Sequence, residues 1–97
     1  MKRVVDFRRA IALLRTHLPP QHPVTVRRVL LPHDTGGYCE LSAKRFQIRV
    51  RRDTITEFQI WILAHEWAHA LCWESDQCED HGPEWGIAMS RVYQVLF

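Results

Sequence analysis

Long apolar runs are absent from this 97-residue sequence, and their absence argues against a membrane protein. No apolar stretch reaches the roughly 18 residues of a transmembrane helix. The first residues are basic, but Asp6, Arg8 and Arg9 interrupt any apolar core of the kind found in signal peptides. We therefore expect a cytoplasmic protein without a membrane segment.

Cysteine is scarce, and the spacing of the three cysteines argues against two common uses. Cys39, Cys72 and Cys78 are odd in number, and no two of them form a C-x-x-C pair. This pattern indicates neither a disulfide framework nor a zinc ribbon. We expect three reduced and partly buried thiols.

Lysine is also rare, because eleven of the thirteen basic residues are arginine. Residues 1–52 carry twelve Lys/Arg and three Asp/Glu, a balance of +9, whereas residues 53–97 carry one Arg and eight Asp/Glu, a balance of −7. A basic surface of this kind can bind an anionic partner such as DNA. Alternatively, the two halves face each other and neutralise their charges, and the sequence does not decide between these interpretations.

The length and the residue pattern predict a single α+β domain over residues 1–97. β-branched residues predict a strand over 24–31, and a glycine-containing turn separates it from a short strand over 38–41. A closing helix is expected to begin at Pro83 and to carry an apolar stripe as far as Leu96. An N-terminal amphipathic helix capped by Asp6 is indicated by apolar residues at spacings of three and four, namely Val4, Phe7, Ile11, Leu14 and Leu18.

Strict alternation of apolar and polar residues predicts a third strand over 45–51. We expect the three strands to form an antiparallel sheet. The polar face of the third strand carries Arg45, Arg49 and Arg51, which are candidate contacts to nucleic-acid phosphates. The same row could instead be a solvated edge that resists aggregation. A substrate strand could pair with this edge.

The segment Trp61–Trp73 contains the sequence His65-Glu66-Trp67-Ala68-His69, an H-E-x-x-H motif. We expect it to lie on a helix that begins near Thr54 to Thr56, where Thr54-x-x-Glu57 and Thr56-x-x-Gln59 are capping-box patterns. Residues four apart project from one face of a helix, so His65 and His69 can bind one metal ion.

Glu66 lies about 100° round the same helix from His65. This position places its carboxylate beside the open coordination site of the metal rather than on the metal. A zinc site with two histidines on one helix needs a third protein ligand and leaves a fourth position for water. The structural alternative to a metal site is a buried helix with two hydrogen-bonded core histidines.

His81 is the main candidate for the third ligand, twelve residues after His69 in a loop that must turn back between two helices. Cys72, three residues after His69, is a weaker candidate. The other weaker candidates are carboxylates of the acidic loop (Glu74, Asp76 and Asp80) and the histidines of the N-terminal half (His17, His22 and His33).

These motifs resemble those of the SprT-like zinc metalloproteases. Proteins of that family carry H-E-x-x-H-A on a helix and, after a variable loop, H-G-P-E followed by an aromatic residue; this chain has the first motif at residues 65–70 and the second at 81–85. The resemblance implies a zincin-like fold and a third zinc ligand from the second histidine segment, here His81. Some family members act on proteins crosslinked to DNA. Small endoribonucleases share the histidine pair, but their third histidine follows after five residues and they do not require a glutamate directly after the first histidine. Glu66 and the longer gap before His81 therefore favour a peptidase.

We therefore predict a zinc metallopeptidase with one Zn²⁺ per chain held by His65, His69 and His81. Glu66 would act as general base on the zinc-bound water. Such sites usually add an oxyanion donor, and Tyr93, Tyr38 and His33 are candidates. The expected partners are a protein or peptide substrate and DNA. The alternative is a non-catalytic module in which zinc stabilises a surface that binds nucleic acid or a protein.

Overall fold

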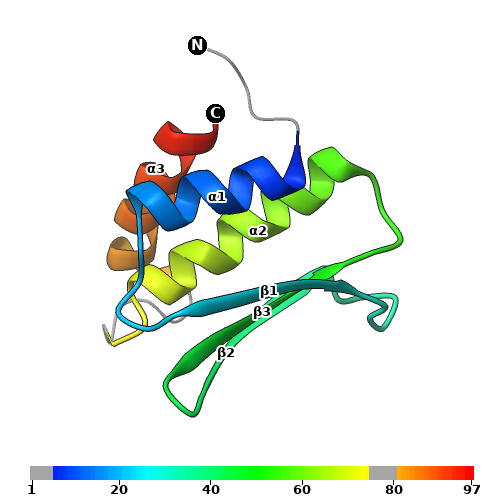
Figure 1. Cartoon of the computed structure of the whole chain (residues 1–97), viewed down its shortest axis with the longest axis horizontal. Helices are drawn as coiled ribbons and strands as arrows, with labels where there is room; N and C mark the ends of the chain where they lie inside the picture. The colour runs from blue at the N-terminus through cyan, green and yellow to red at the C-terminus, as the bar shows by residue number, and fades with distance from the viewer. Residues whose placement is uncertain (1–5, 75–80) are drawn as a thin grey trace.

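The computed structural model describes residues 6–74 and 81–97 and contains the predicted elements in the predicted order. In these described residues the elements are three helices and three strands, arranged as in Figure 1. Their bounds are α1 (Phe7–His17), β1 (Val24–Val29), β2 (Gly37–Ser42), β3 (Arg45–Arg51), α2 (Thr56–Leu71) and α3 (Pro83–Leu96). The expected α+β class is confirmed. The Asp6 carboxylate accepts a hydrogen bond from the Arg9 backbone N–H, which confirms Asp6 as the cap of α1. None of the described helices is long and apolar enough to cross a membrane.

The sheet is mixed, so the prediction of a purely antiparallel sheet is wrong for β1. The strand order is β1-β3-β2, with β1 parallel to β3 and β2 antiparallel to β3. A tight hairpin joins β2 and β3, and its two turn residues, Ala43 and Lys44, have positive φ. The chain therefore crosses from β1 to the far edge before it returns through the centre. As a result β3 is the central strand, and the prediction that residues 45–51 form a free edge is also wrong.

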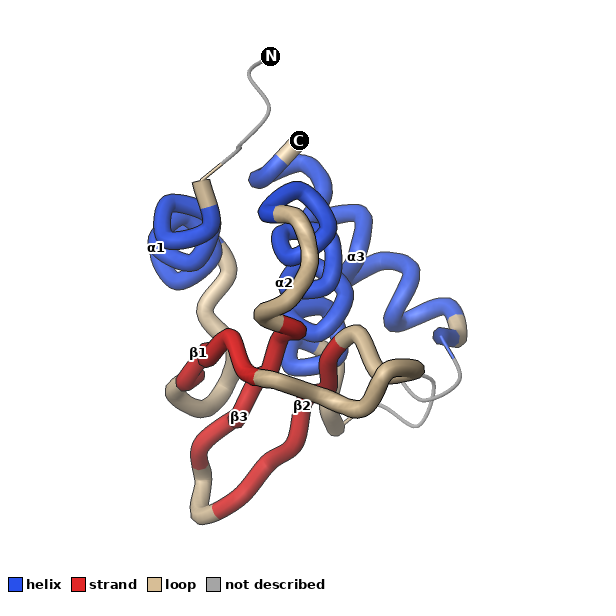
Figure 2. The backbone as a smooth tube through the Cα atoms, turned by 90° about the vertical axis from the view of Figure 1, so that its right-hand side faces the viewer, coloured by secondary structure: helices blue, strands red, loops and turns tan. Residues whose placement is uncertain are grey.

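All three helices lie on one face of the sheet, as the two perpendicular views show (Figures 1 and 2). The inner face of β3 is formed by Phe46, Ile48 and Val50, each at most 1% exposed. Within the described part of the chain, no element covers the opposite face, which carries Arg45, Gln47, Arg49 and Arg51. The alternation predicted for residues 45–51 is confirmed.

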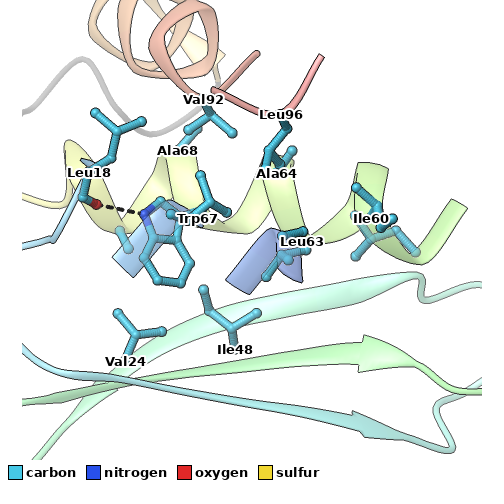
Figure 3. Close-up of a cluster of buried hydrophobic side chains, with 14 of the residues drawn as sticks. Leu18, Val24, Ile48, Ile60, Leu63, Ala64, Trp67, Ala68, Val92 and Leu96 are labelled. Carbon is cyan, nitrogen blue, oxygen red and sulfur yellow. Dashed lines mark hydrogen bonds between the residues drawn. The ribbon is translucent and has the colours of Figure 1, made fainter. Parts of the chain in front are cut away.

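Helix α2 is the centre of the core, because it contacts the other two helices as well as β2 and β3. Trp67 is fully buried, and its indole N–H donates a 2.8 Å hydrogen bond to the Leu18 carbonyl at the end of α1 (Figure 3). That carbonyl is left without a helical partner where α1 stops, so the bond satisfies two buried polar groups at once. The core is therefore packed around the helix that carries the H-E-x-x-H motif.

Strand β2 approaches α2 so closely that Gly37 has no room for a side chain. A Cβ atom at Gly37 would lie 2.5 Å from Ile62 Cγ2 and 2.6 Å from the Arg49 carbonyl oxygen. The glycine therefore permits the contact between the free-edge strand β2 and the helix that carries the metal ligands.

The start of α2 differs from the predicted capping boxes. Its N-cap is Ile55, which makes no side-chain cap. Gln59, only 4% exposed, instead donates hydrogen bonds to the Arg51 and Arg52 carbonyls at 3.1 and 3.0 Å and accepts one from Arg28 at 3.3 Å. Gln59 is buried against the chain that leads into the helix, so its amide is used there and not at the helix end.

Candidate metal centre

His65 and His69 project from the same face of α2, as their spacing predicts, and both are partly exposed at one side of the core. Their ring centroids lie 5.0 Å apart. Their neighbours Ala64, Trp67 and Ala68 are buried, so packing fixes the helix while the two imidazoles remain accessible. The alternative of two core histidines buried by the fold is therefore wrong.

His81 completes a triad with the two helical histidines. Its Nε2 atom lies 3.0 Å from His65 Nε2 and 3.2 Å from His69 Nε2. The residue precedes the N-cap Gly82 and the first helical residue Pro83 of α3, and its φ is +57°. A left-handed conformation is uncommon for a residue with a Cβ, although histidine adopts it more often than most. This backbone turn directs the imidazole toward α2 at the point where α3 begins.

The donor set and its spacing fit a Zn²⁺ ion. Two imidazole nitrogens bound to one tetrahedral zinc at the usual bond length lie about 3.3 Å apart. The two His81 distances, 3.0 and 3.2 Å, are close to this value. Three imidazoles with room for a fourth ligand are the donor set of catalytic zinc sites. Of the metal-binding side chains in residues 6–74 and 81–97, only these three form such a cluster.

The environment keeps the two helical histidines neutral, the form that binds a metal. Burial, together with the smaller effects of the neighbouring His65 and His81, lowers the pKa of His69 to about 4. Burial and the proximity of His81 also lower the pKa of His65. A proton therefore competes weakly for these two nitrogens at neutral pH.

Glu66 is buried next to the triad, on the side of α2 that faces β2. Only 9% of the residue is exposed. Burial raises the pKa of its carboxyl group to about 7, because removal from water disfavours the charged form. Its charge in turn contributes to the raised pKa of Cys39 on β2. A carboxyl group with a pKa near neutral pH can both accept and donate a proton.

Trp85 is a site residue whose role sequence reasoning missed. Its ring centroid lies 5.0 Å from that of His65, 5.7 Å from His69 and 4.6 Å from His81. Its indole nitrogen is buried and has no hydrogen-bond partner among the described residues. The indole therefore forms an apolar wall behind all three imidazoles. The sequence shows this aromatic residue as the last position of the family motif and as part of the apolar stripe of α3, but neither observation predicted a contact with the histidines.

The weaker ligand candidates are not part of the cluster. Cys72 is disulfide-bonded, so it offers no thiolate, and the expectation of three reduced thiols is wrong. Cys39 is a free cysteine. Glu74 and the N-terminal histidines His17, His22 and His33 do not join the triad. Asp76, Asp80 and Cys78 lie outside the described residues.

The three candidate oxyanion donors lie on different elements. Tyr38 pairs with Arg49 in the sheet, whereas its neighbour Cys39 pairs with the fully buried Ile48. Because side chains alternate along a strand, Tyr38 projects from the face opposite Glu66, which disfavours the role. Tyr93 is exposed on α3, and its ring centroid lies 5.1 Å from that of Phe97. It remains a predicted donor, as does the exposed turn residue His33.

The three arginines of the predicted phosphate-binding row differ in how far their guanidinium groups are already bound within the fold. Arg45 donates to Thr25 Oγ1 at 3.1 Å, and Arg49 donates to Gln47 Oε1 at 2.9 Å. Arg51 is part of the fold: its guanidinium donates to the carbonyls of Thr35, Leu31 and Pro32 and forms a 2.9 Å ion pair with Asp53. Arg51 therefore holds the connection between β1 and β2 and has little capacity left for a phosphate.

Comparison with protein families gives a match over most of the chain. The model of the SprT-like family matches residues 7–96, which is nearly the whole chain. No curated protein and no solved structure matches the chain. The matched range includes the three histidines, Glu66 and Trp85.

Proposed function

Because the chain belongs to the SprT-like family, we propose that it is a zinc-dependent metallopeptidase that hydrolyses peptide bonds in protein substrates. The observation that carries this proposal is the convergence of three imidazole Nε2 atoms, two from α2 and one from His81 before α3. The buried Glu66 lies next to His65 on α2. The neutral histidines favour metal binding, and the pKa of Glu66 favours proton transfer at neutral pH.

In this proposal each residue has a distinct task. His65, His69 and His81 hold the ion, and Trp85 supports their rings. A bound Zn²⁺ would act as a Lewis acid and lower the pKa of water, so that a nucleophile forms near neutral pH. Glu66 accepts the proton of the attacking water and then donates it to the leaving amine. The raised pKa of the carboxyl group suits the second step, because a weaker acid holds the proton until the amine departs.

The free edge of β2 is the part of the sheet best placed to hold a substrate. Strand β3 is paired on both sides, whereas β2 has one unpaired edge and contacts α2. An extended peptide could add to that edge by main-chain hydrogen bonds. The Cys39 side of β2 lies near Glu66, so a peptide on this edge would pass the general base. This arrangement replaces the predicted docking on residues 45–51.

The competing hypothesis is a non-catalytic module in which the metal only stabilises the fold. A structural site with three histidines has no need for a buried carboxyl group beside it, and burial of such a group is costly. The distinguishing experiment measures zinc content by metal analysis and cleavage of an unfolded protein substrate, with and without a chelator. We expect about one zinc per chain and chelator-sensitive cleavage. Zinc binding without cleavage would support the non-catalytic module.

A further inference from the structure

Phe58 and Trp61 lie on the same face of α2 as its two candidate metal ligands. Of residues 58–69, only Phe58, Trp61, His65 and His69 are not buried. Their spacings of three, four and four residues place the four side chains in one stripe along the helix. Phe58 is 44% exposed and Trp61 is 46% exposed. The part of α2 that reaches solvent is therefore apolar at one end and carries the metal ligands at the other.

Helix α3 widens the apolar end of this stripe. It packs antiparallel to α2, so that its start lies beside the triad and its end lies beside Trp61. The ring centroid of Phe97, directly after α3, lies 6.2 Å from that of Trp61 and 5.1 Å from that of Tyr93. Tyr93 is 54% exposed. We call the group of Phe58, Trp61, Tyr93 and Phe97 the aromatic shelf.

The aromatic shelf is a group of exposed apolar side chains rather than a single one. Phe58, Trp61 and Tyr93 are three of the eight large apolar side chains that are exposed in the part of the chain that the structure describes. Single exposed apolar residues are common on soluble proteins, whereas a contiguous group marks a binding site. No shelf residue is charged, so the shelf suits an apolar group. Trp61 lies one helix turn from His65, so a molecule held at the metal centre reaches the shelf.

The helix geometry gives the distance from the metal ligands to the shelf. Trp61 lies four residues before His65, which is about 6 Å along the axis of α2. Phe58 lies seven residues before His65, or about 10 Å along the axis. An extended peptide advances about 3.3 Å per residue. A peptide held at the metal centre therefore has the side chain that meets the shelf two or three residues from the reacting carbonyl.

Strand β2 gives the same spacing independently. It runs alongside α2 in the same direction, because Gly37 meets Ile62 and Cys39 lies near Glu66. A peptide added to the free edge of β2 follows this direction. Its residue level with the general base is therefore two positions from its residue level with Ile62, the sequence neighbour of Trp61.

We propose that the aromatic shelf binds a large apolar side chain of the protein substrate, two or three residues from the bond that is cut. This inference rests on the proposed peptidase function and names its substrate class, which is unfolded segments that contain aromatic or large aliphatic residues. Folded proteins bury such residues, so the shelf selects chains that have lost their fold. A charged side chain is disfavoured at this position, because it would lose water without gaining a polar partner.

The first test maps by mass spectrometry every bond that the full chain cuts in an unfolded protein. The test variant is Phe58→Ala/Trp61→Ala, and the control is Leu30→Ala/Ile87→Ala, which removes two exposed apolar side chains outside the shelf. The wild-type chain and the control should favour a large apolar residue over alanine at the shelf position by about tenfold, because a side chain on an open shelf buries roughly half of its surface. The test variant should lose most of this preference. A general disturbance of the fold would instead slow all cuts alike.

A binding measurement separates this inference from the peptidase function, because it needs no cleavage. The isotope-labelled Glu66→Gln chain is titrated with two Gly/Ser peptides that differ only in a central Phe or Ala, and NMR follows the indole N–H signal of Trp61. The Phe peptide should shift this signal, and the Ala peptide should not. If the Phe peptide shifts the signal but the wild-type chain cleaves no substrate, the shelf is supported as an apolar peptide site and the peptidase function fails.

Three results would overturn the inference. The first is cleavage by the wild-type chain without an apolar preference, or with a preference that Phe58→Ala/Trp61→Ala retains. The second is an indole signal of Trp61 that does not respond to the Phe peptide. The third is a wild-type chain that sediments as a dimer while the shelf variant sediments as a monomer, because the shelf would then bind a second copy of the chain.

Discussion

The Nε2 atoms of His65 and His81 lie 3.0 Å apart, although the two residues are sixteen positions apart in the sequence. One atom comes from the middle of α2 and the other from the residue that precedes the N-cap of α3. The fold brings them together because α3 packs along α2 and the left-handed backbone at His81 directs its ring back toward that helix. The two candidate ligands of α2, His65 and His69, are thereby joined by His81 from the start of α3.

The first prediction follows from this geometry. His81→Ala should lose most of the zinc that the wild-type chain carries, because two histidines on one helix turn provide only a bidentate site. The control is His33→Ala, which removes an exposed turn histidine outside the triad. Metal analysis of both purified variants makes the comparison. Full zinc occupancy in His81→Ala would contradict the assignment of the third ligand.

A second prediction concerns the close contact between β2 and α2. Gly37→Ala should destabilise the fold by about 1–3 kcal/mol, the usual cost of overpacking, because the new methyl group would collide with Ile62 and with the Arg49 carbonyl. Gly86→Ala is the matched control: nothing lies within 4 Å of a Cβ there, and the residue is inside α3. It should stabilise the fold by about 0.5–1 kcal/mol. Urea unfolding of the wild-type chain and both variants gives the change in the free energy of unfolding for each substitution. Changes of the same sign for both substitutions would refute the packing argument.

A third prediction concerns the free thiol beside Glu66. Burial, together with the smaller effects of the negative charges of Glu66 and Glu40, raises the pKa of Cys39 from the usual value near 9.0 to about 12. At pH 8 only about one thiol in ten thousand is then ionised. The native chain should therefore react with iodoacetamide at Cys39 far more slowly than the unfolded chain, as mass spectrometry of the labelled peptide would show. Similar rates in the two states would contradict the buried environment.

The same shift has a consequence for stability at high pH. The pKa of Cys39 in the folded chain lies above its pKa in the unfolded chain. The stability that this thiol contributes is therefore fully present at any pH below the pKa of the unfolded chain. It declines as the pH rises from about 9 toward 12, since the unfolded chain loses the proton first. Replacing Cys39 with Ala should remove this part of the pH dependence.

Local patterns in the sequence predict the helices and strands of this fold well, whereas contacts between distant segments were predicted less well. The alternation at 45–51 and the Asp6 cap are local, and both are confirmed. The parallel pairing of β1 with β3 depends on where the chain goes after Val29, which no local pattern records. The roles of Gln59 and Arg51 also depend on distant carbonyls, so a capping box and a phosphate contact were predicted in their place.

The candidate site shows the same division. The helical spacing of His65 and His69 is sufficient to place both on one face, and the H-G-P-E motif pointed to His81. Trp85 was missed as a support for the triad, because an aromatic residue at helical spacing is equally consistent with the core. Its contact with three imidazoles appears only when α2 and α3 are packed together.

The central claim is that Glu66 transfers protons in peptide hydrolysis. Glu66→Gln preserves the shape of the side chain and can still hydrogen-bond a water, but it cannot accept a proton. Loss of a general base typically costs roughly 10²–10⁴ in rate. The control is Glu40→Gln, which makes the same chemical change at an exposed position of β2 on the outer face.

The most direct measurement is single-turnover cleavage of an unfolded protein substrate by the wild-type chain, Glu66→Gln and Glu40→Gln at matched zinc occupancy. We predict that Glu66→Gln keeps its zinc and its fold and is slower by about 10²-fold or more, while Glu40→Gln cleaves at the wild-type rate. Equal rates for the wild-type chain and Glu66→Gln would contradict the proposed mechanism.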